Sequence, residues 1–125
     1  MAAATNYLEA EVLDHVLGTG AYTMPTQVYI KLHVGAPGED ADANAAAETT
    51  RQAADWNAAA SPGGTAALSA TVSWTNVSTT ETYSHFSLWD ASTAGNPLIY
   101  GALDSPVAVT AGDNFDITAL PVSLA

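Results

Sequence analysis

Apolar residues recur at three- and four-residue spacings in the opening segment, N-Y-L-E-A-E-V-L-D-H-V-L-G. That spacing is typical of one face of an amphipathic helix. Thr5 or Asn6 is suited to cap the helix start, and Gly18 suits the left-handed residue that ends many helices. The segment therefore predicts a helix over residues 5–18. We expect side chains such as Leu13 to pack against a sheet or a neighbouring subunit.

Beyond residue 26 the pattern changes to the two-residue alternation of half-buried strands. Val28–Val34 places Val28, Ile30, Leu32 and Val34 on one face and Tyr29, Lys31 and His33 on the other. Further strands are predicted at Arg51–Trp56, Leu68–Trp74, Tyr83–Asp90, Leu98–Leu103, Val107–Thr110, Phe115–Thr118 and Leu120–Leu124, with a hairpin turn at A-G-D-N. The chain thus predicts a mainly β, single-domain fold. Residues 26–124 would form an antiparallel β-sandwich or small barrel, preceded by one N-terminal α-helix.

The charge balance excludes several classes of partner. Thirteen acidic residues face only two basic ones, Lys31 and Arg51, so the formal net charge is -11. Nucleic-acid binding needs cations that neutralise phosphates, and anionic membrane surfaces repel such a chain. The N-terminus lacks the basic and apolar regions of a signal peptide, and no apolar run is long enough to span a bilayer. We expect no nucleic-acid or membrane partner.

No motif indicates catalysis or a bound metal. Asp40, Asp42 and Asn44 resemble the first ligands of a calcium loop, but Ala45 and Arg51 occupy the positions of its glycine and its bidentate glutamate. The sequence contains no G-x-S-x-G elbow and no phosphate-binding glycine loop. We therefore predict no catalytic residue, no metal and no cofactor.

The three histidines are far apart in sequence and lack metal-ligand spacing. His15 is expected to act electrostatically at the C-terminal end of the helix. His85 is expected to be a hydrogen-bonded residue of a sheet. Arg51 is expected to pair with a carboxylate, either within the chain or across a subunit boundary.

Aromatic residues permit two interpretations. Trp56, Trp74 and Trp89, with Tyr83, Phe86 and Tyr100, could form a platform on which sugars stack. The alternative is that Trp56 and Trp74 fill the core or its lid, as large aromatic residues do in small domains. We favour the core interpretation for these two tryptophans.

Three features together resemble a family of small tailed-phage virion proteins. They are the opening helix, the segment A-Y-T-M-P-T-Q-V-Y-I-K-L and the block H-F-S-L-W-D-A-S-T-A-G-N-P-L-I-Y-G-A-L. Members of that family are tail fibre proteins, and some resemble capsid decoration (cement) proteins. The resemblance implies a β-rich structural protein of a bacteriophage particle, oligomeric and without enzymatic activity, made in the cytoplasm of the host bacterium.

We interpret the chain as a decoration protein on the outer surface of the phage head, because a base-poor surface suits an outward-facing coat. Its partners would be the major capsid protein and other copies of itself in a homotrimer, as the resemblance implies. The alternative is a tail-fibre or receptor-binding component that touches host glycans. Tyr29, Lys31, His33 and Arg51 are the predicted interface residues, and Lys31 and His33 depart from the apolar or small residues expected there.

Overall fold

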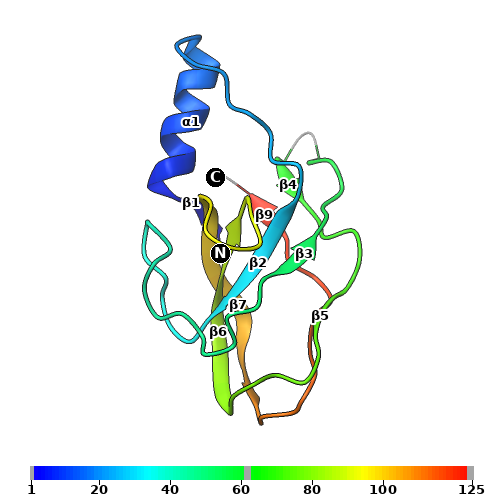
Figure 1. Ribbon diagram of the computed structural model, residues 1–125. Helices are drawn as coiled ribbons and strands as arrows, with labels where there is room; N and C mark the ends of the chain where they lie inside the picture. The colour runs from blue at the N-terminus through cyan, green and yellow to red at the C-terminus, as the bar shows by residue number, and fades with distance from the viewer. Residues whose placement is uncertain (1, 61–62, 124–125) are drawn as a thin grey trace.

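A computed structural model describes residues 2–60 and 63–123 of the 125-residue chain. Within those ranges one helix is followed by antiparallel sheets, which confirms the predicted mainly β fold (Figure 1). The elements are β1 (Ala2–Ala4), α1 (Asn6–Leu17), β2 (Val28–His33), β3 (Gln52–Ala54), β4 (Thr65–Ala66), β5 (Val72–Trp74), β6 (Glu81–Trp89), β7 (Pro97–Val109), β8 (Phe115–Ile117) and β9 (Val122–Ser123). No helix in the described ranges is long and apolar enough to cross a membrane.

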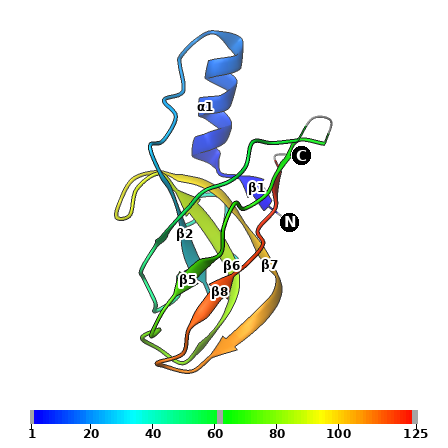
Figure 2. The same cartoon turned by 90° about the vertical axis from the view of Figure 1, so that its right-hand side faces the viewer.

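The strands form one large sheet and two small ones. The large sheet has the order β1-β7-β6-β2-β3, and the small sheets are β4-β9 and β5-β8. Figure 2 shows β5 and β8 lying across the large sheet. The apolar core lies between these layers, where Ile30, Leu32, Phe86 and Leu88 belong to one cluster with Val72, Trp74, Phe115, Ile117, Leu120 and Val122. The predicted alternation thus places Ile30 and Leu32 in the core, with Val28 packed against it. Val34, predicted on the same face, lies beyond the end of β2 and is exposed.

Helix α1 has the caps that its sequence predicts. The Leu8 N–H donates to Thr5 Oγ1, and that hydroxyl donates to the carbonyl of Pro97 at 2.7 Å. Gly18 adopts the left-handed conformation at φ 78°. Beyond the helix, the Tyr22 N–H donates to His15 Nδ1 at 3.1 Å, so His15 also ties the following link to the last turn.

The apolar face of α1 does not pack on the sheet. Only Leu8 is buried, whereas Leu13, Val16 and Leu17 are 58%, 72% and 71% exposed. Both views show the helix projecting beyond the end of the strands (Figures 1 and 2). The prediction that Leu13 packs against the chain's own sheet is therefore wrong, whereas its packing against another subunit stays a prediction.

Strand pairing differs from the expected order at the C-terminal end. The two strands predicted on either side of Ser105 form one strand, β7, which bulges where its partner passes from Tyr83 to His85. A bulge accommodates Pro106 because the unpaired stretch needs no N–H donor there. The A-G-D-N turn forms, with the Asp113 N–H donating to the Thr110 carbonyl.

That turn does not join a hairpin, however, because β8 pairs with β5 and the chain crosses between layers. Two short strands, β1 and β4, were not predicted, since β1 is three alanines and β4 lies in a turn-rich segment. Leu124 of the last predicted strand and residues 61–62 of the predicted turn lie outside the described residues.

One core residue carries a hydroxyl group without a partner. Tyr83 is fully buried, and its ring meets Phe115 edge-on with centroids 5.0 Å apart. Its hydroxyl has no hydrogen-bond partner within residues 2–60 and 63–123. Burial, followed by the charges of Glu81 and Glu48, raises the pKa of the Tyr83 phenol to about 12. The hydroxyl therefore contributes desolvation cost without a compensating hydrogen bond.

We predict that Tyr83→Phe leaves the free energy of unfolding unchanged or raises it by up to about 2 kcal/mol, because the ring stays and the unpaired hydroxyl goes. Urea unfolding at pH 7 measures the change. Tyr83→Ala, which also removes the ring, should cost about 3–5 kcal/mol as the control. A loss of more than about 1 kcal/mol in Tyr83→Phe would show that the hydroxyl has a stabilising partner.

Candidate functional site

The outer face of the large sheet, which points away from the core, collects the predicted interface residues. Tyr29, Lys31 and His33 alternate along β2, and their cross-strand partners on β6 are Trp89, Ser87 and His85. On the other edge of β2, Tyr29 pairs with Ala53 and Ile30 with Gln52 of β3. Continuing this register by one residue places Arg51 beside Lys31. The structure thus brings all four predicted residues to one face of one sheet.

Trp89 is the centre of this group. The Lys31 Nζ lies 5.4 Å from the centroid of the Trp89 ring, and the Arg51 Cζ lies 4.0 Å from it. Both distances are within the range of cation–π attraction. We call Tyr29, Lys31, Arg51 and Trp89 the outer patch; all four side chains are half-buried.

Arg51 is held by backbone carbonyls rather than by a carboxylate. Its Nη1 donates to the carbonyls of Ala91 and Ala94, at 2.9 and 2.7 Å, in the loop that joins β6 to β7. Within the described residues Arg51 forms no salt bridge. The prediction that it pairs with a carboxylate of its own chain is therefore wrong. Burial lowers the pKa of Arg51, and the charge of Asp90 opposes that shift.

Hydrogen bonds and one glycine fix the conformation of the β6–β7 loop. Asp90 Oδ1 accepts the Asn96 N–H at 2.7 Å, and Oδ2 accepts from the Asn96 side chain at 3.1 Å. Gly95 adopts φ 75°, and a Cβ at this position would overlap the Asp90 carboxylate. Glycine is therefore required here for both its conformation and its lack of a side chain.

A buried chain of hydrogen bonds holds the indole N–H of Trp89. The Trp89 Nε1–H donates to Ser87 Oγ at 2.8 Å, Ser87 Oγ is 2.7 Å from His33 Nε2, and His33 Nδ1 is 2.9 Å from the Ala43 carbonyl. A carbonyl only accepts, so Nδ1 carries the proton and the Ser87 hydroxyl donates to Nε2. His33 and Ser87 are both fully buried. His33 therefore supports the outer patch and is not an exposed contact residue.

The other residues considered for chemistry lie elsewhere. His85 is opposite His33 in the sheet and hydrogen bonds through Nδ1 with Ser84 at 2.8 Å, as expected of a sheet residue. In the acidic loop, Asp40 accepts from the Asn6 side chain, and the Asn44 side chain donates to the Ala36 carbonyl. Across the described ranges, no group of three or more His, Cys, Asp or Glu residues could hold a metal ion.

Two of the three tryptophans belong to the core, as the sequence favoured. Trp74 is 1% exposed and its indole N–H donates to the Thr50 carbonyl. Trp56 packs against the core and donates to the Leu120 carbonyl. Trp89 alone of the three remains at a surface beside charged groups, and sequence reasoning left it out of the predicted interface. The alternation of Phe86 and Leu88 with Trp89 could have placed Trp89 on the outer face, but only the pairing of β6 with β2 brings it beside Lys31.

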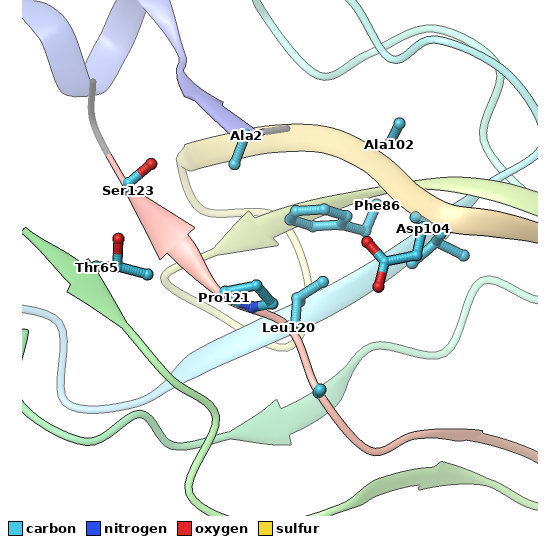
Figure 3. A pocket seen from close by; sticks show the side chains of 10 residues that line it. Ala2, Thr65, Phe86, Ala102, Asp104, Leu120, Pro121 and Ser123 are labelled. Carbon is cyan, nitrogen blue, oxygen red and sulfur yellow. The ribbon is translucent and has the colours of Figure 1, made fainter. Parts of the chain in front are cut away.

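A cleft of about 290 Å³ opens between β7 and the segment that leads into β9 (Figure 3). Phe86 lies along one wall with Leu120 and Pro121 opposite, while Asp104 lies at one end and Thr65 and Ser123 at the other (Figure 3). Asp104 is the one titratable side chain among the residues that line it. General acid–base catalysis needs a positioned donor and acceptor at a reacting group, and this lining offers a single such side chain.

The fold is thus a β-rich body with a projecting helix and a sheet face that carries aromatic and cationic side chains. The chain belongs to the family of the podophage GP4 fiber I protein gp80, whose model matches residues 3–125. It is a phage tail fibre protein and not an enzyme. No curated protein matches the chain.

The family confirms a structural protein of the virion and corrects its place in the particle. A fibre component corresponds to the tail-fibre alternative and not to capsid decoration. The decoration interpretation was based on the base-poor surface, which suits an outward-facing fibre component equally well. The major capsid protein was expected as partner only through that interpretation.

We predict that the buried His33 makes the protein sensitive to acid. Burial, the largest cause, lowers the pKa of His33 from its ordinary value of 6.5, and the charges of Lys31 and His85 lower it further. The unfolded chain therefore binds a proton near pH 6.5, where the folded chain does not. The free energy of unfolding should be highest above pH 7 and fall below pH 6.5. The slope for one proton is at most about 1.4 kcal/mol per pH unit.

Urea unfolding between pH 7.5 and 5 measures this slope. His33→Gln retains a side-chain donor and acceptor but does not titrate, so its stability should depend less on pH than that of the native chain. Equal slopes in His33→Gln and the native chain would contradict the prediction.

Proposed function

We propose that this fibre protein is an oligomeric subunit, a homotrimer, whose copies associate through the exposed face of α1. The observation that carries the proposal is the exposure of Leu13, Val16 and Leu17 on a 12-residue helix that buries only Leu8. Helices of this length are marginal in water unless their apolar face is packed. The outer turns of α1 therefore need a partner surface that their own chain does not supply.

The same chain carries a suitable partner surface. A hollow of about 250 Å³ lies at the foot of α1, where Leu8 and Tyr22 meet the end of the large sheet at Leu88 and Leu98. Its lining is almost entirely apolar, and Trp56 forms part of it. An apolar projection and an apolar hollow on one chain allow a head-to-tail contact between copies. Such contacts form a closed ring when the rotation between copies permits, as in a trimer.

Charge favours an apolar contact over a contact made by ion pairs. Each copy carries a formal net charge of -11, and the two basic side chains lie together over Trp89. Copies therefore repel one another at long range, and the repulsion is screened by salt. An interface built from Leu13, Val16 and Leu17 should consequently strengthen as ionic strength rises.

A second candidate function is contact with host glycans, and it is favoured by the outer patch. Tyr29 and Trp89 are cross-strand partners, and Tyr100 of β7 lies opposite Ser87 on the same face. All three aromatic side chains are half-buried, so each presents part of its ring. Aromatic rings of this kind combine an apolar surface with a polar group, which suits contact with a sugar ring.

We predict that Leu13→Gln/Leu17→Gln weakens self-association at least about tenfold, because two buried leucine contacts at an interface contribute more than 1.4 kcal/mol. Glutamine keeps a high helix propensity, and both sites are exposed in the single chain, so the unfolding of the monomer should change by no more than about 1 kcal/mol. Sedimentation equilibrium at 50 and 500 mM NaCl measures association.

Val107→Gln is the matched control, since Val107 is an exposed apolar residue on β7 and 39% accessible. It should associate as the native chain does. The proposal fails if the native chain is monomeric at both salt concentrations, or if the helix variant and the control associate equally.

A further inference from the structure

Both basic side chains of the protein lie over one aromatic ring. The sequence has two Lys or Arg residues against thirteen Asp or Glu residues, yet Lys31 and Arg51 both approach Trp89. The charge of Arg51 contributes to lowering the pKa of Lys31, after the larger effect of burial. The two cations therefore repel each other at a half-buried position.

No salt bridge within the described residues compensates this repulsion. Within residues 2–60 and 63–123, neither Lys31 nor Arg51 forms a salt bridge. Asp90 is close enough to influence the pKa of Arg51, but its carboxylate accepts two hydrogen bonds from Asn96. An anion placed beside the two cations would relieve their repulsion and make the charge-assisted contacts that the chain itself does not provide.

Two members of the outer patch, Trp89 and Arg51, are positioned before any ligand arrives. Trp89 is held by its hydrogen bond to Ser87, which is in turn bonded to His33, and Arg51 is held by the carbonyls of Ala91 and Ala94. Side chains that are already ordered lose little conformational entropy on binding. Tyr29, the cross-strand partner of Trp89, adds an aromatic surface beside the charges.

We propose that the outer patch binds an acidic sugar, one that carries a carboxylate or a phosphate group. The anionic group would lie against Lys31 and Arg51, and the sugar ring would contact Tyr29 and the accessible part of Trp89. This proposal rests on the glycan-binding candidate above and gives it a chemical class. Distant acidic residues oppose it only weakly, because physiological salt screens charges beyond about 8 Å.

The test compares three sugars that share one ring: glucose, glucuronic acid and glucose 6-phosphate. Binding is followed by NMR titration of the Trp89 indole N–H signal, which Trp89→Phe identifies, at constant ionic strength. We expect glucuronic acid or glucose 6-phosphate to bind at least about tenfold more tightly than glucose, the gain of a charge-assisted contact. Whichever acid binds more tightly identifies a carboxylate or a phosphate as the natural group.

Three variants locate the site. Lys31→Gln should abolish the preference for the acidic sugar, and Lys31→Arg, which keeps the charge, should retain it. Asn114→Asp is the control, because it changes the net charge as Lys31→Gln does but at a residue next to β8. It also keeps the oxygen that accepts the Asn76 N–H. Its preference should equal that of the native chain.

The outcomes separate this proposal from those before it. Equal binding of glucose and the acidic sugars overturns the acidic class and leaves the glycan candidate intact, whereas no binding of any sugar overturns both. Inorganic phosphate that binds as tightly as glucose 6-phosphate reduces the patch to a simple anion site and overturns the role of the sugar ring. An acidic preference that persists in Lys31→Gln also overturns the proposal. Self-association through α1 is measured separately and does not depend on these results.

Discussion

The antiparallel pairing of β2 with β6 is the constraint on which the rest of the structure depends. Its register places Ile30 opposite Leu88 and Leu32 opposite Phe86, all of them in the core. The same register turns every intervening residue to the outer face, because side chains alternate along a strand. A shift of one residue would exchange the two faces and expose the core. Core and outer patch are consequently set by one interaction.

Polar groups buried beneath the outer face give that surface its rigidity. His33 and Ser87 are fully buried, yet each has its hydrogen bonds satisfied, and together they connect the loop at Ala43 to the ring of Trp89. Satisfied polar networks of this kind specify one arrangement of the side chains that they join. The desolvation that lowers the pKa of His33 also keeps it neutral, so the network holds at physiological pH.

The amphipathic pattern of α1 predicts the helix but not the surface that covers its apolar face. Periodicity and capping residues predicted α1 well, because helix formation depends on neighbours along the chain. The same pattern predicted a buried face, and that face is buried only at Leu8 within its own chain. An apolar face indicates that a surface is needed, but it carries no information on which molecule supplies that surface. The formal net charge of -11 disfavours contacts between copies that are made by ion pairs.

By itself the sequence determined the helix, most of the strands, the acidic character and the alternation that puts Tyr29, Lys31 and His33 on one face of β2. These properties depend on residues close together in the chain. Only the tertiary structure decided that Arg51 and Trp89 join that face, that β8 pairs with β5 and that His33 is buried. Each of these depends on register or on a covering loop, and both are selected by packing between segments distant in sequence.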